Sequence, residues 1–164
     1  MKEIVLYHGS DISVQHPQIL KEKSKHDFGT AFYLTTNYDQ ANKWAKHKFK
    51  RNGYVGKPRV SVFSFNLQAL SQIKVKKFDS STTFWLEYVM KNRLGFNDEN
   101  FSDYDLVIGP LVDGYLSWRT LKMYSRHQIT YEEAITRLHP ENLDNQWAFK
   151  SKKSLNYLKY KGTL

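Results

Sequence analysis

We expect the chain to be organised around the stretch Asp27-Phe28-Gly29-Thr30-Ala31-Phe32-Tyr33-Leu34-Thr35-Thr36. Because glycine adopts positive φ angles without steric cost, Gly29 indicates a tight turn near the start of this stretch. Aromatic and β-branched side chains dominate residues 31–36, which favours a strand. Asn37 follows as a candidate N-cap, and Gln40 stands three residues further on, as in a capping box. The pattern therefore predicts a turn, a strand and a helix over residues 40–50 in direct succession.

Two aromatic side chains in this unit are candidates for function. Tyr33 lies in the middle of the expected strand, and Trp44 lies about two turns into the helix that follows. Ala41, Ala45 and Phe49 recur with Trp44 at helical spacing, so this helix has one apolar face. The two rings form either the two sides of one slot or ordinary core contacts, and the residues alone leave both interpretations open.

Length and composition indicate one globular domain over residues 1–164. Aromatic residues make up 15% of the chain, which favours a packed core over disorder. Cysteine is absent, which excludes disulfides and thiolate chemistry and agrees with a reducing, cytoplasmic location. Neither a signal-peptide pattern nor an apolar run of roughly 20 residues occurs, so we expect no membrane partner.

The formal net charge of +9 is concentrated in four segments. Such a balance favours nucleic acid, acidic proteins or anionic ligands as partners. A solvated, lysine-rich surface without a partner explains the same composition, and this alternative stays open. The segments are residues 21–25, 43–59, 74–77 and 150–161.

Beyond the opening unit, strands and helices alternate without the regular order of a doubly wound sheet, so we expect the α+β class. The first strand is expected to end at His8-Gly9-Ser10, which would place His8 at a cleft. The six histidines show no metal-ligand spacing, so no metal site is expected. Strands are predicted at residues 3–7, 59–65, 73–78, 104–110, 145–149 and 158–164, and helices or helical turns at residues 67–70, 80–94, 115–124, 130–138 and 151–157.

Several motifs together resemble the NAD-binding signature of the ADP-ribosyltransferase superfamily. The similarity is to the branch with His, Tyr and Glu at three strand positions, which includes diphtheria toxin and the poly(ADP-ribose) polymerases. Over nearly its full length the chain also resembles a bacterial family of small, uncharacterised ADP-ribosyltransferase-like proteins, regarded as toxins of toxin–antitoxin pairs. The motifs are Tyr7-His8-Gly9-Ser10, Gly29-Thr30-Ala31-Phe32-Tyr33, Gln40-Ala41 to Trp44-Ala45, residues 103–110 and Asn145-Gln146.

This resemblance implies split, mixed β-sheets flanked by short helices, with an NAD cleft between the sheets. NAD would serve as the substrate and no metal would be needed. Tyr33 would stack on the nicotinamide ring, with Trp44 as the opposite side of the slot. The implied NAD-binding residues are His8, Gly9, Ser10, Gly29, Tyr33 and Trp44.

The roles implied at the end of the first strand fit the chemistry of those residues. The His8 imidazole can donate to or accept from a ribose hydroxyl. The backbone of Gly9 would read the nicotinamide carboxamide, because a residue without Cβ permits a close approach. Ser10 would add a hydroxyl contact.

The third catalytic position departs from the superfamily pattern. Where Glu is usual, the late strand offers Gln146, which forms hydrogen bonds but has no negative charge. The implied catalytic residues are therefore His8, Tyr33 and Gln146. A surface-strand role for Gln146 remains open, in which case Glu87 or Glu133 would be sought as the catalytic carboxylate.

Two functions follow as expectations. The first is an NAD-dependent ADP-ribosyltransferase that modifies an intracellular protein or nucleic acid, with a small antitoxin protein as a further partner. The second is a catalytically weak module that binds NAD, ADP-ribose or nucleic acid. The motif cluster favours the first, whereas Gln146 and the +9 charge favour the second.

Overall fold

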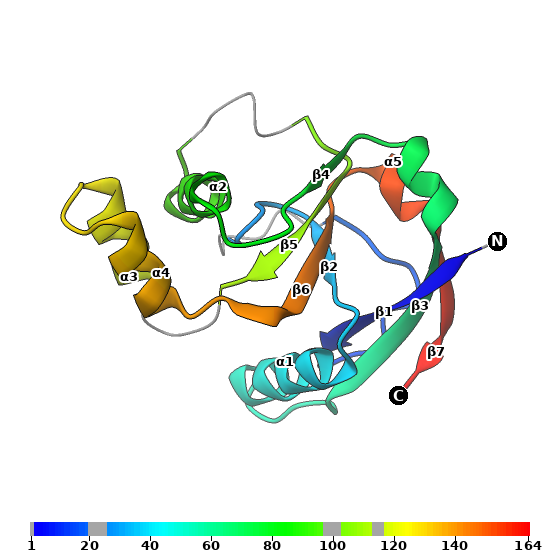
Figure 1. Ribbon diagram of the computed structural model, residues 1–164. Helices are drawn as coiled ribbons and strands as arrows, with labels where there is room; N and C mark the ends of the chain where they lie inside the picture. The colour runs from blue at the N-terminus through cyan, green and yellow to red at the C-terminus, as the bar shows by residue number, and fades with distance from the viewer. Residues whose placement is uncertain (1, 20–25, 97–102, 113–116) are drawn as a thin grey trace.

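The computed structural model describes residues 2–19, 26–96, 103–112 and 117–164, with only the backbone at residues 141–144. Short strands and helices alternate along the chain (Figure 1). They are β1 (Glu3–Ser10), β2 (Phe32–Leu34), α1 (Tyr38–Arg51), β3 (Arg59–Asn66), the 3-10 helix η1 (Leu67–Ser71), β4 (Val75–Lys77), α2 (Thr83–Leu94), β5 (Leu106–Leu111), α3 (Ser117–Ser125), α4 (Tyr131–Leu138), β6 (Glu141–Phe149), α5 (Lys152–Leu155) and β7 (Leu158–Thr163).

The described strands form two sheets. One is antiparallel with the order β1-β3-β7, and the other has the order β2-β6-β5-β4, in which only β4 and β5 run parallel. The sheets meet where Tyr7 and Thr35 exchange two backbone hydrogen bonds of 2.8 and 3.0 Å. The predicted α+β class is confirmed, and the second sheet is mixed.

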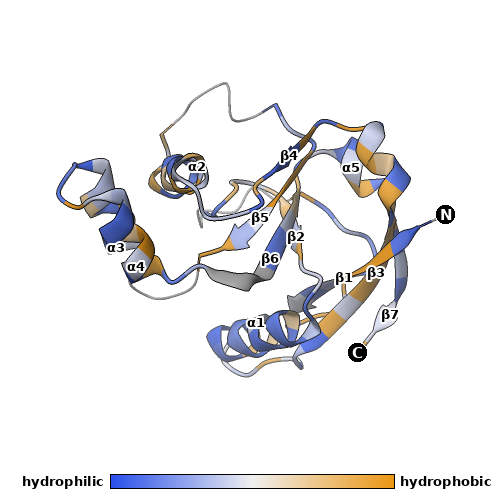
Figure 2. Cartoon of the chain, viewed as in Figure 1, coloured by the Kyte–Doolittle hydropathy of each residue, from blue (hydrophilic) through white to orange (hydrophobic). Residues whose placement is uncertain are grey.

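Side chains on the strands of the four-stranded sheet point alternately into two hydrophobic cores, one on each face of that sheet. Phe32 and Leu34 of β2, with Trp147 and Phe149 of β6, face the three-stranded sheet and pack between the two sheets. The opposite face of the four-stranded sheet carries Ala148. Figure 2 shows the hydrophobic colour concentrated on β3 and β5 and a largely hydrophilic α1.

The helices cover the outer faces of the two sheets (Figure 1). Trp85 and Leu86 of α2, Leu121 of α3 and Leu138 of α4 are fully buried in the core on the four-stranded sheet. On the other side of the molecule, α1 lies against β1 and β3. Its contact is close because Gly9 has no side chain, and a Cβ there would lie 1.9 Å from the Ala41 carbonyl oxygen.

Most predicted elements are present with shifted ends. Thr82 caps α2 and Gly95 ends it with a φ of 73°. Thr130 forms with Glu133 the capping box of α4 that their spacing in the sequence predicts. The lysines at residues 74, 76 and 77 predict an edge strand, because such a row resists pairing with other chains, and β4 is an edge strand of its sheet. Residues 21–25 and the expected helix start at residues 115–116 lie outside the described residues.

Three local predictions are wrong. Residues 8–10 continue β1 rather than ending it, because they pair with Ser61, Val60 and Arg59 of β3. The Gly109-Pro110 pair, which as a strand breaker predicts the end of the strand at residues 104–110, lies inside β5. Gln40 forms no direct capping box, because its Oε1 accepts from the Thr35 hydroxyl (2.9 Å), which in turn accepts from the Asn37 N–H (3.1 Å).

Candidate functional site

A tight turn at residues 26–29 organises the candidate site. The Gly29 N–H donates to the His26 carbonyl at 3.1 Å, and Gly29 has the expected positive φ of 80°. The Tyr33 hydroxyl donates to the Gly29 carbonyl at 2.6 Å and accepts from the Phe28 N–H at 3.1 Å. The Lys150 ammonium donates to the Phe28 carbonyl. The predicted turn therefore exists, and Tyr33 holds it from the strand that follows.

Asp27 is the central acceptor of this turn. Its side chain is buried, and Oδ1 accepts from Arg93 Nε at 2.7 Å. Oδ2 accepts from the Val112 N–H at 3.0 Å and from Gln146 Nε2 at 2.7 Å. Buried carboxylates need such compensation because desolvation disfavours their charge. Asp27 thus links α2, the end of β5 and β6.

Gln146 is buried beside Asp27, which excludes the surface-strand role. Its Nε2 donates one hydrogen bond to Asp27 and a second, of 3.2 Å, to the Pro110 carbonyl. The Trp85 indole N–H donates to the same carbonyl at 3.1 Å. Both N–H groups of the amide are therefore used within the protein, which leaves Oε1 as the group that Gln146 can offer to a ligand.

Tyr33 and Gln146 share one face of the four-stranded sheet. Tyr33 pairs with Ala148, and Gln146 precedes Ala148 by two residues, so their side chains point to the same side. Burial, followed by the nearby Asp27 carboxylate, raises the pKa of the Tyr33 hydroxyl well above its ordinary value. The hydroxyl therefore stays protonated and acts as a hydrogen-bond donor at neutral pH. The ring centroid of His26 lies 5.2 Å from that of Tyr33.

His8 is joined to Tyr33 at the edge of β2. Its Nδ1–H donates to the Tyr33 carbonyl at 2.8 Å, and its ring stacks on Phe32 with 4.3 Å between centroids. With the proton on Nδ1, a neutral imidazole presents Nε2 as an acceptor. The bond lies one residue beyond the Tyr7–Thr35 bridge, so it fixes His8 where the two sheets meet.

Gly9 and Ser10 are buried next to His8. The close approach that Gly9 permits in the structure is that of α1. The Ser10 hydroxyl donates to Asp11 Oδ1 at 3.2 Å. Contacts of either residue with a ligand remain predictions.

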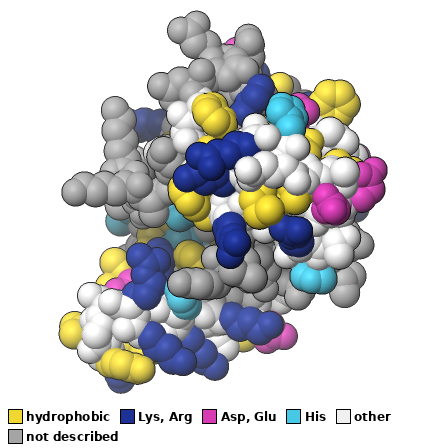
Figure 3. All heavy atoms as spheres, turned by 90° about the vertical axis from the view of Figure 1, so that its left-hand side faces the viewer, with side chains coloured by type: hydrophobic (Ala, Val, Ile, Leu, Met, Phe, Trp, Pro, Cys, Tyr) yellow, Lys and Arg dark blue, Asp and Glu magenta, His cyan; other side chains and the backbone are white. Residues whose placement is uncertain are grey.

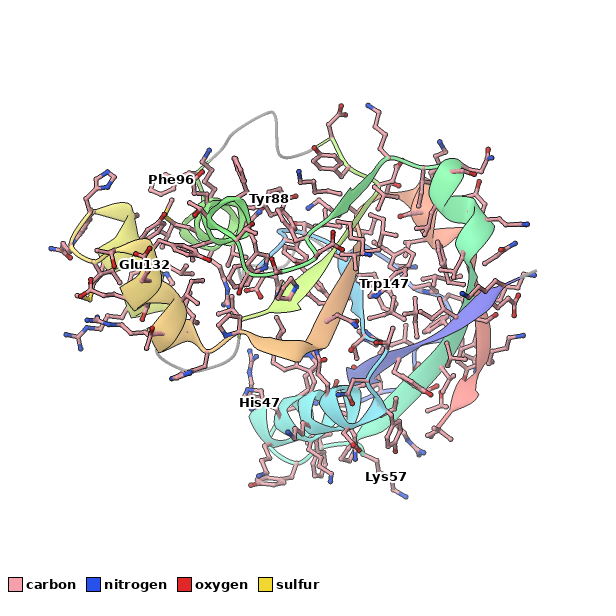
Figure 4. The ribbon with its side chains drawn as sticks, in the orientation of Figure 1. His47, Lys57, Tyr88, Phe96, Glu132 and Trp147 are labelled. Carbon is pink, nitrogen blue, oxygen red and sulfur yellow. The ribbon has the colours of Figure 1, made fainter. Side chains whose placement is uncertain are left out.

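The expected pairing of Tyr33 with Trp44 is absent from the described residues. Trp44 is 44% exposed and stacks on His47, with 5.5 Å between ring centroids and 22° between planes. Figure 4 shows His47 pointing from α1 toward the start of β6. Of the predicted residues, the structure joins His8, Tyr33 and Gln146, with Gly29, around one turn, whereas Trp44 stands apart on α1.

The alternative carboxylates are placed elsewhere. Glu133 accepts from the Thr130 N–H at 2.8 Å in the α4 capping box, so it is committed to that helix end. Glu87 lies half-buried on α2 and contributes to the raised pKa of Tyr124, after burial as the main cause. Within the described residues no cluster of three possible metal ligands occurs. No described helix is long and apolar enough to cross a membrane.

Three residues of the site were missed by sequence reasoning. The sequence predicts a loop pair for His26 and Asp27, a helix at residues 80–94 that contains Arg93, and a basic segment at residues 150–161 that contains Lys150. A local signal existed only for Asp27, which is the first residue of the stretch 27–36 and lies within the turn at residues 26–29. Arg93 and Lys150 join the site through contacts across 66 and 122 residues of sequence, which no local pattern reveals.

Lys150 gives the first prediction. Burial lowers its pKa from 10.5 to about 8, so above about pH 8 the unfolded chain binds more protons than the folded one. The free energy of unfolding should therefore rise with pH in that window, whereas Lys150→Met lacks this contribution. We expect the difference between wild type and variant to grow by about 1–2 kcal/mol between about pH 7.5 and 9.5.

Urea unfolding at several pH values measures this difference. Lys152→Met, which alters an exposed lysine nearby, is the matched control and should run parallel to wild type. The pH range of this experiment ends below the ordinary pKa of tyrosine. Above that pKa, the raised pKa values of Tyr33 and Tyr88 make the free energy of unfolding fall as the pH rises. Parallel curves for Lys150→Met would contradict the proposed burial of its charge.

The sequence matches one family model over most of its length. A family model described as "Protein of unknown function (DUF3990)" matches residues 4–160. No curated protein and no solved structure matches the chain. The family description assigns no activity, so function rests on the site itself.

Proposed function

This chain belongs to the DUF3990 family, and we propose that it is an NAD-dependent ADP-ribosyltransferase acting on an intracellular acceptor. The observation that carries the proposal is the hydrogen bond from His8 Nδ1 to the Tyr33 carbonyl. It joins the imidazole of the first motif that resembles an NAD signature to the backbone of the strand that carries the Tyr33 ring of the second. It does so at the junction of two sheets, where the cleft is expected.

The proposed reaction begins with the nicotinamide–ribose bond. That bond breaks with its electron pair passing to the nicotinamide nitrogen, which loses its positive charge, and an oxocarbenium-like ribose remains. The acceptor's nucleophile then bonds to the anomeric carbon and releases a proton. Nε2 of His8 would accept from a ribose hydroxyl, and the Tyr33 ring would stack on the nicotinamide.

Gln146 limits the rate in this proposal. Its amide is held by Asp27 and Pro110, so Oε1 would accept from a ribose hydroxyl without supplying a full negative charge. The Asp27 carboxylate is itself paired with Arg93, so its charge is largely compensated. Since charge stabilisation in the transition state is a large term in such reactions, we expect turnover to be slow compared with binding.

The internal hydrogen bonds of the site favour a second candidate, a module that binds NAD or ADP-ribose without transferring it. The Tyr33 hydroxyl and both Gln146 N–H groups already have partners within the fold. A site built this way can retain ribose recognition and stacking while lacking the charge that drives bond cleavage. Binding without nicotinamide release would identify this second function.

The test is calorimetric titration with NAD, followed by nicotinamide release and transfer of labelled ADP-ribose in a cell lysate. Wild type should bind NAD and release nicotinamide. Tyr33→Ala should weaken binding by about 1–3 kcal/mol, by analogy with base–aromatic stacking. His8→Ala should reduce both binding and release, because the ribose loses its acceptor.

Thr36→Ala is the matched control, because this residue follows β2 but bonds to Asn145 rather than to the turn at residues 26–29. It should leave NAD affinity within about twofold of wild type. Absence of NAD binding by the wild-type protein would refute the transferase, and absence of binding in a parallel titration with ADP-ribose would refute the second candidate as well. A neutralising antitoxin would compete with NAD or the acceptor if it covers this site.

A further inference from the structure

A basic surface runs along α1 and the turn into β3, apart from the turn at residues 26–29. Between residues 40 and 66 the chain contains seven Lys and Arg residues and no Asp or Glu. Six of them are exposed, and none forms an ion pair within the described residues. We call this the α1 surface, defined by Lys43, Lys46, Lys50, Arg51, Lys57 and Arg59 together with the exposed rings of Trp44 and Tyr54.

The cations gather on the outward sides of the helix. Ala41 and Ala45 face β1 and β3, so Lys43, Lys46 and Lys50 point away from the sheet. Figure 3 shows a row of dark-blue side chains along the lower part of this side of the molecule, at the height of α1 in Figure 1. Figure 4 shows Lys57 pointing outward at the far end of the surface. Like charges held together without acidic partners create a positive potential that attracts a polyanion.

Two exposed aromatic rings lie among these charges. Tyr54 is 65% exposed, has a positive φ of 62° and rests edge-on against Phe49, with 5.4 Å between ring centroids. Trp44 is stacked on His47. Both rings are therefore supported by a neighbour while one face remains available. A solvated lysine surface has no need of such rings, because exposing them to water is unfavourable.

The Trp44 side of α1 also leads toward the candidate site. Gln40, Trp44, His47 and Arg51 follow one another at helical spacing along one side of the helix. Gln40 bonds to Thr35 next to the end of β2, so this side faces the junction of the two sheets.

We propose that the α1 surface binds single-stranded nucleic acid, with phosphates on the lysines and arginines and bases stacked on Tyr54 and Trp44. Alternation of cations with accessible rings matches a chain of phosphates and unpaired bases. An acidic protein would contact the cations but has no bases to stack on the rings. In a duplex the faces of the bases are stacked on one another and cannot contact the rings. Asp11 approaches this surface but is held by Asn52 Nδ2 at 2.9 Å. The inference concerns binding alone and does not depend on the proposed NAD chemistry.

The test measures fluorescence anisotropy of labelled strands of about 12 nucleotides, a length within the range of known single-strand sites. Separate arms use DNA, RNA and a duplex. The triple variant Lys43→Gln, Lys46→Gln and Lys50→Gln should bind at least tenfold more weakly at low salt. Its salt slope should also fall by about 2, since each lost phosphate contact on a single strand removes about 0.7.

The matched control is Lys152→Gln, Lys159→Gln and Lys161→Gln, which removes the same charge from exposed residues elsewhere. This control variant should bind the labelled single strand less than about threefold more weakly, because it lowers only the total positive potential of the protein. Tyr54→Ala, which changes no charge, should weaken single-strand binding by about tenfold and leave duplex binding unchanged. Circular dichroism confirms that each variant is folded.

Three outcomes would overturn the proposal. Equal losses in the two triple variants would show a diffuse charge effect without a defined surface. Duplex binding as tight as single-strand binding, unaffected by Tyr54→Ala, would remove the stacking role. Binding of phosphatidylserine vesicles in preference to either strand would assign the surface to a membrane. Because the assay contains no NAD, its result is separate from that of the nicotinamide-release test.

Discussion

Replacing Asp27 with Ala should lower the free energy of unfolding by about 3–5 kcal/mol, the range for breaking a buried ion pair. The carboxylate accepts three hydrogen bonds, from Arg93, from the Val112 N–H and from Gln146. Its removal leaves these donors without their acceptor in a buried place. Urea unfolding monitored by tryptophan fluorescence measures the loss.

Asp79→Ala is the control for this prediction. Asp79 pairs with Lys77 at 3.1 Å, and both side chains are largely exposed, so its loss should cost less than about 1 kcal/mol. The loss of unfolding free energy in Asp27→Asn should lie between those of Asp27→Ala and Asp79→Ala, since an amide keeps one acceptor but turns a second acceptor into a donor. An Asp27→Ala variant as stable as Asp79→Ala would mean that Asp27 does not connect α2, β5 and β6 as described.

Gln146→Glu should produce a large, pH-dependent loss of stability. The new carboxyl would lie about where the amide now donates to Asp27 at 2.7 Å, so two carboxylates would face each other. Like charges at this distance cannot both ionise freely, and the introduced carboxyl should have a pKa roughly 2–3 units above the value near 4.3 of an unfolded chain. At neutral pH the loss relative to wild type should reach about 3–4 kcal/mol.

The direction of the pH dependence follows from proton binding. With a raised pKa, the folded variant holds its proton over a range in which the unfolded chain has lost it. The variant is therefore least impaired below about pH 4.5, and its deficit grows as pH rises toward about 7. Unfolding of wild type and variant at about pH 4.5 and about pH 7.5 measures this change.

Gln146→Met is the matched comparison, because it removes the hydrogen bonds without adding charge. Its deficit should be nearly the same at both pH values. A pH-independent deficit in Gln146→Glu as well would show that the introduced carboxyl points away from Asp27. Stability data should accompany any activity measured on Gln146 variants, since the residue is both a candidate catalytic group and a structural donor.

The turn, strand and helix ends around residues 27–36 and in the later helices can be predicted from local sequence. A glycine before a β-branched, aromatic run predicts a turn and a strand from backbone sterics, and Gly29 and β2 confirm both. Thr82, Gly95 and Thr130 mark helix ends through side-chain and backbone capping, which also acts within a few residues. These features are local in the chain, so a single sequence suffices to read them.

The surroundings of Gly9, Gln146 and Trp44 depend on contacts between segments that are far apart in the chain. The role of Gly9 in the structure comes from the packing of α1, a contact that spans 32 residues of sequence. Gln146 lacked any local signal for burial, and only the meeting of β6 with the turn at residues 26–29 gives it Asp27 as a partner. For Trp44, the helical pattern predicts its neighbours on α1, and it stacks on one of them, His47. The pattern does not predict which part of the protein α1 faces.

The range of the physical interaction separates the features that can be predicted from the sequence from those that require the folded structure. Turn and cap preferences arise from sterics and hydrogen bonds within about four residues, and they are written in the local sequence. The Asp27–Arg93–Gln146 network depends on desolvation, which exists only after the sheets and α2 have excluded water. Charge along α1 was visible in the sequence, but its separation from acidic partners became visible only when the described side chains were placed in space.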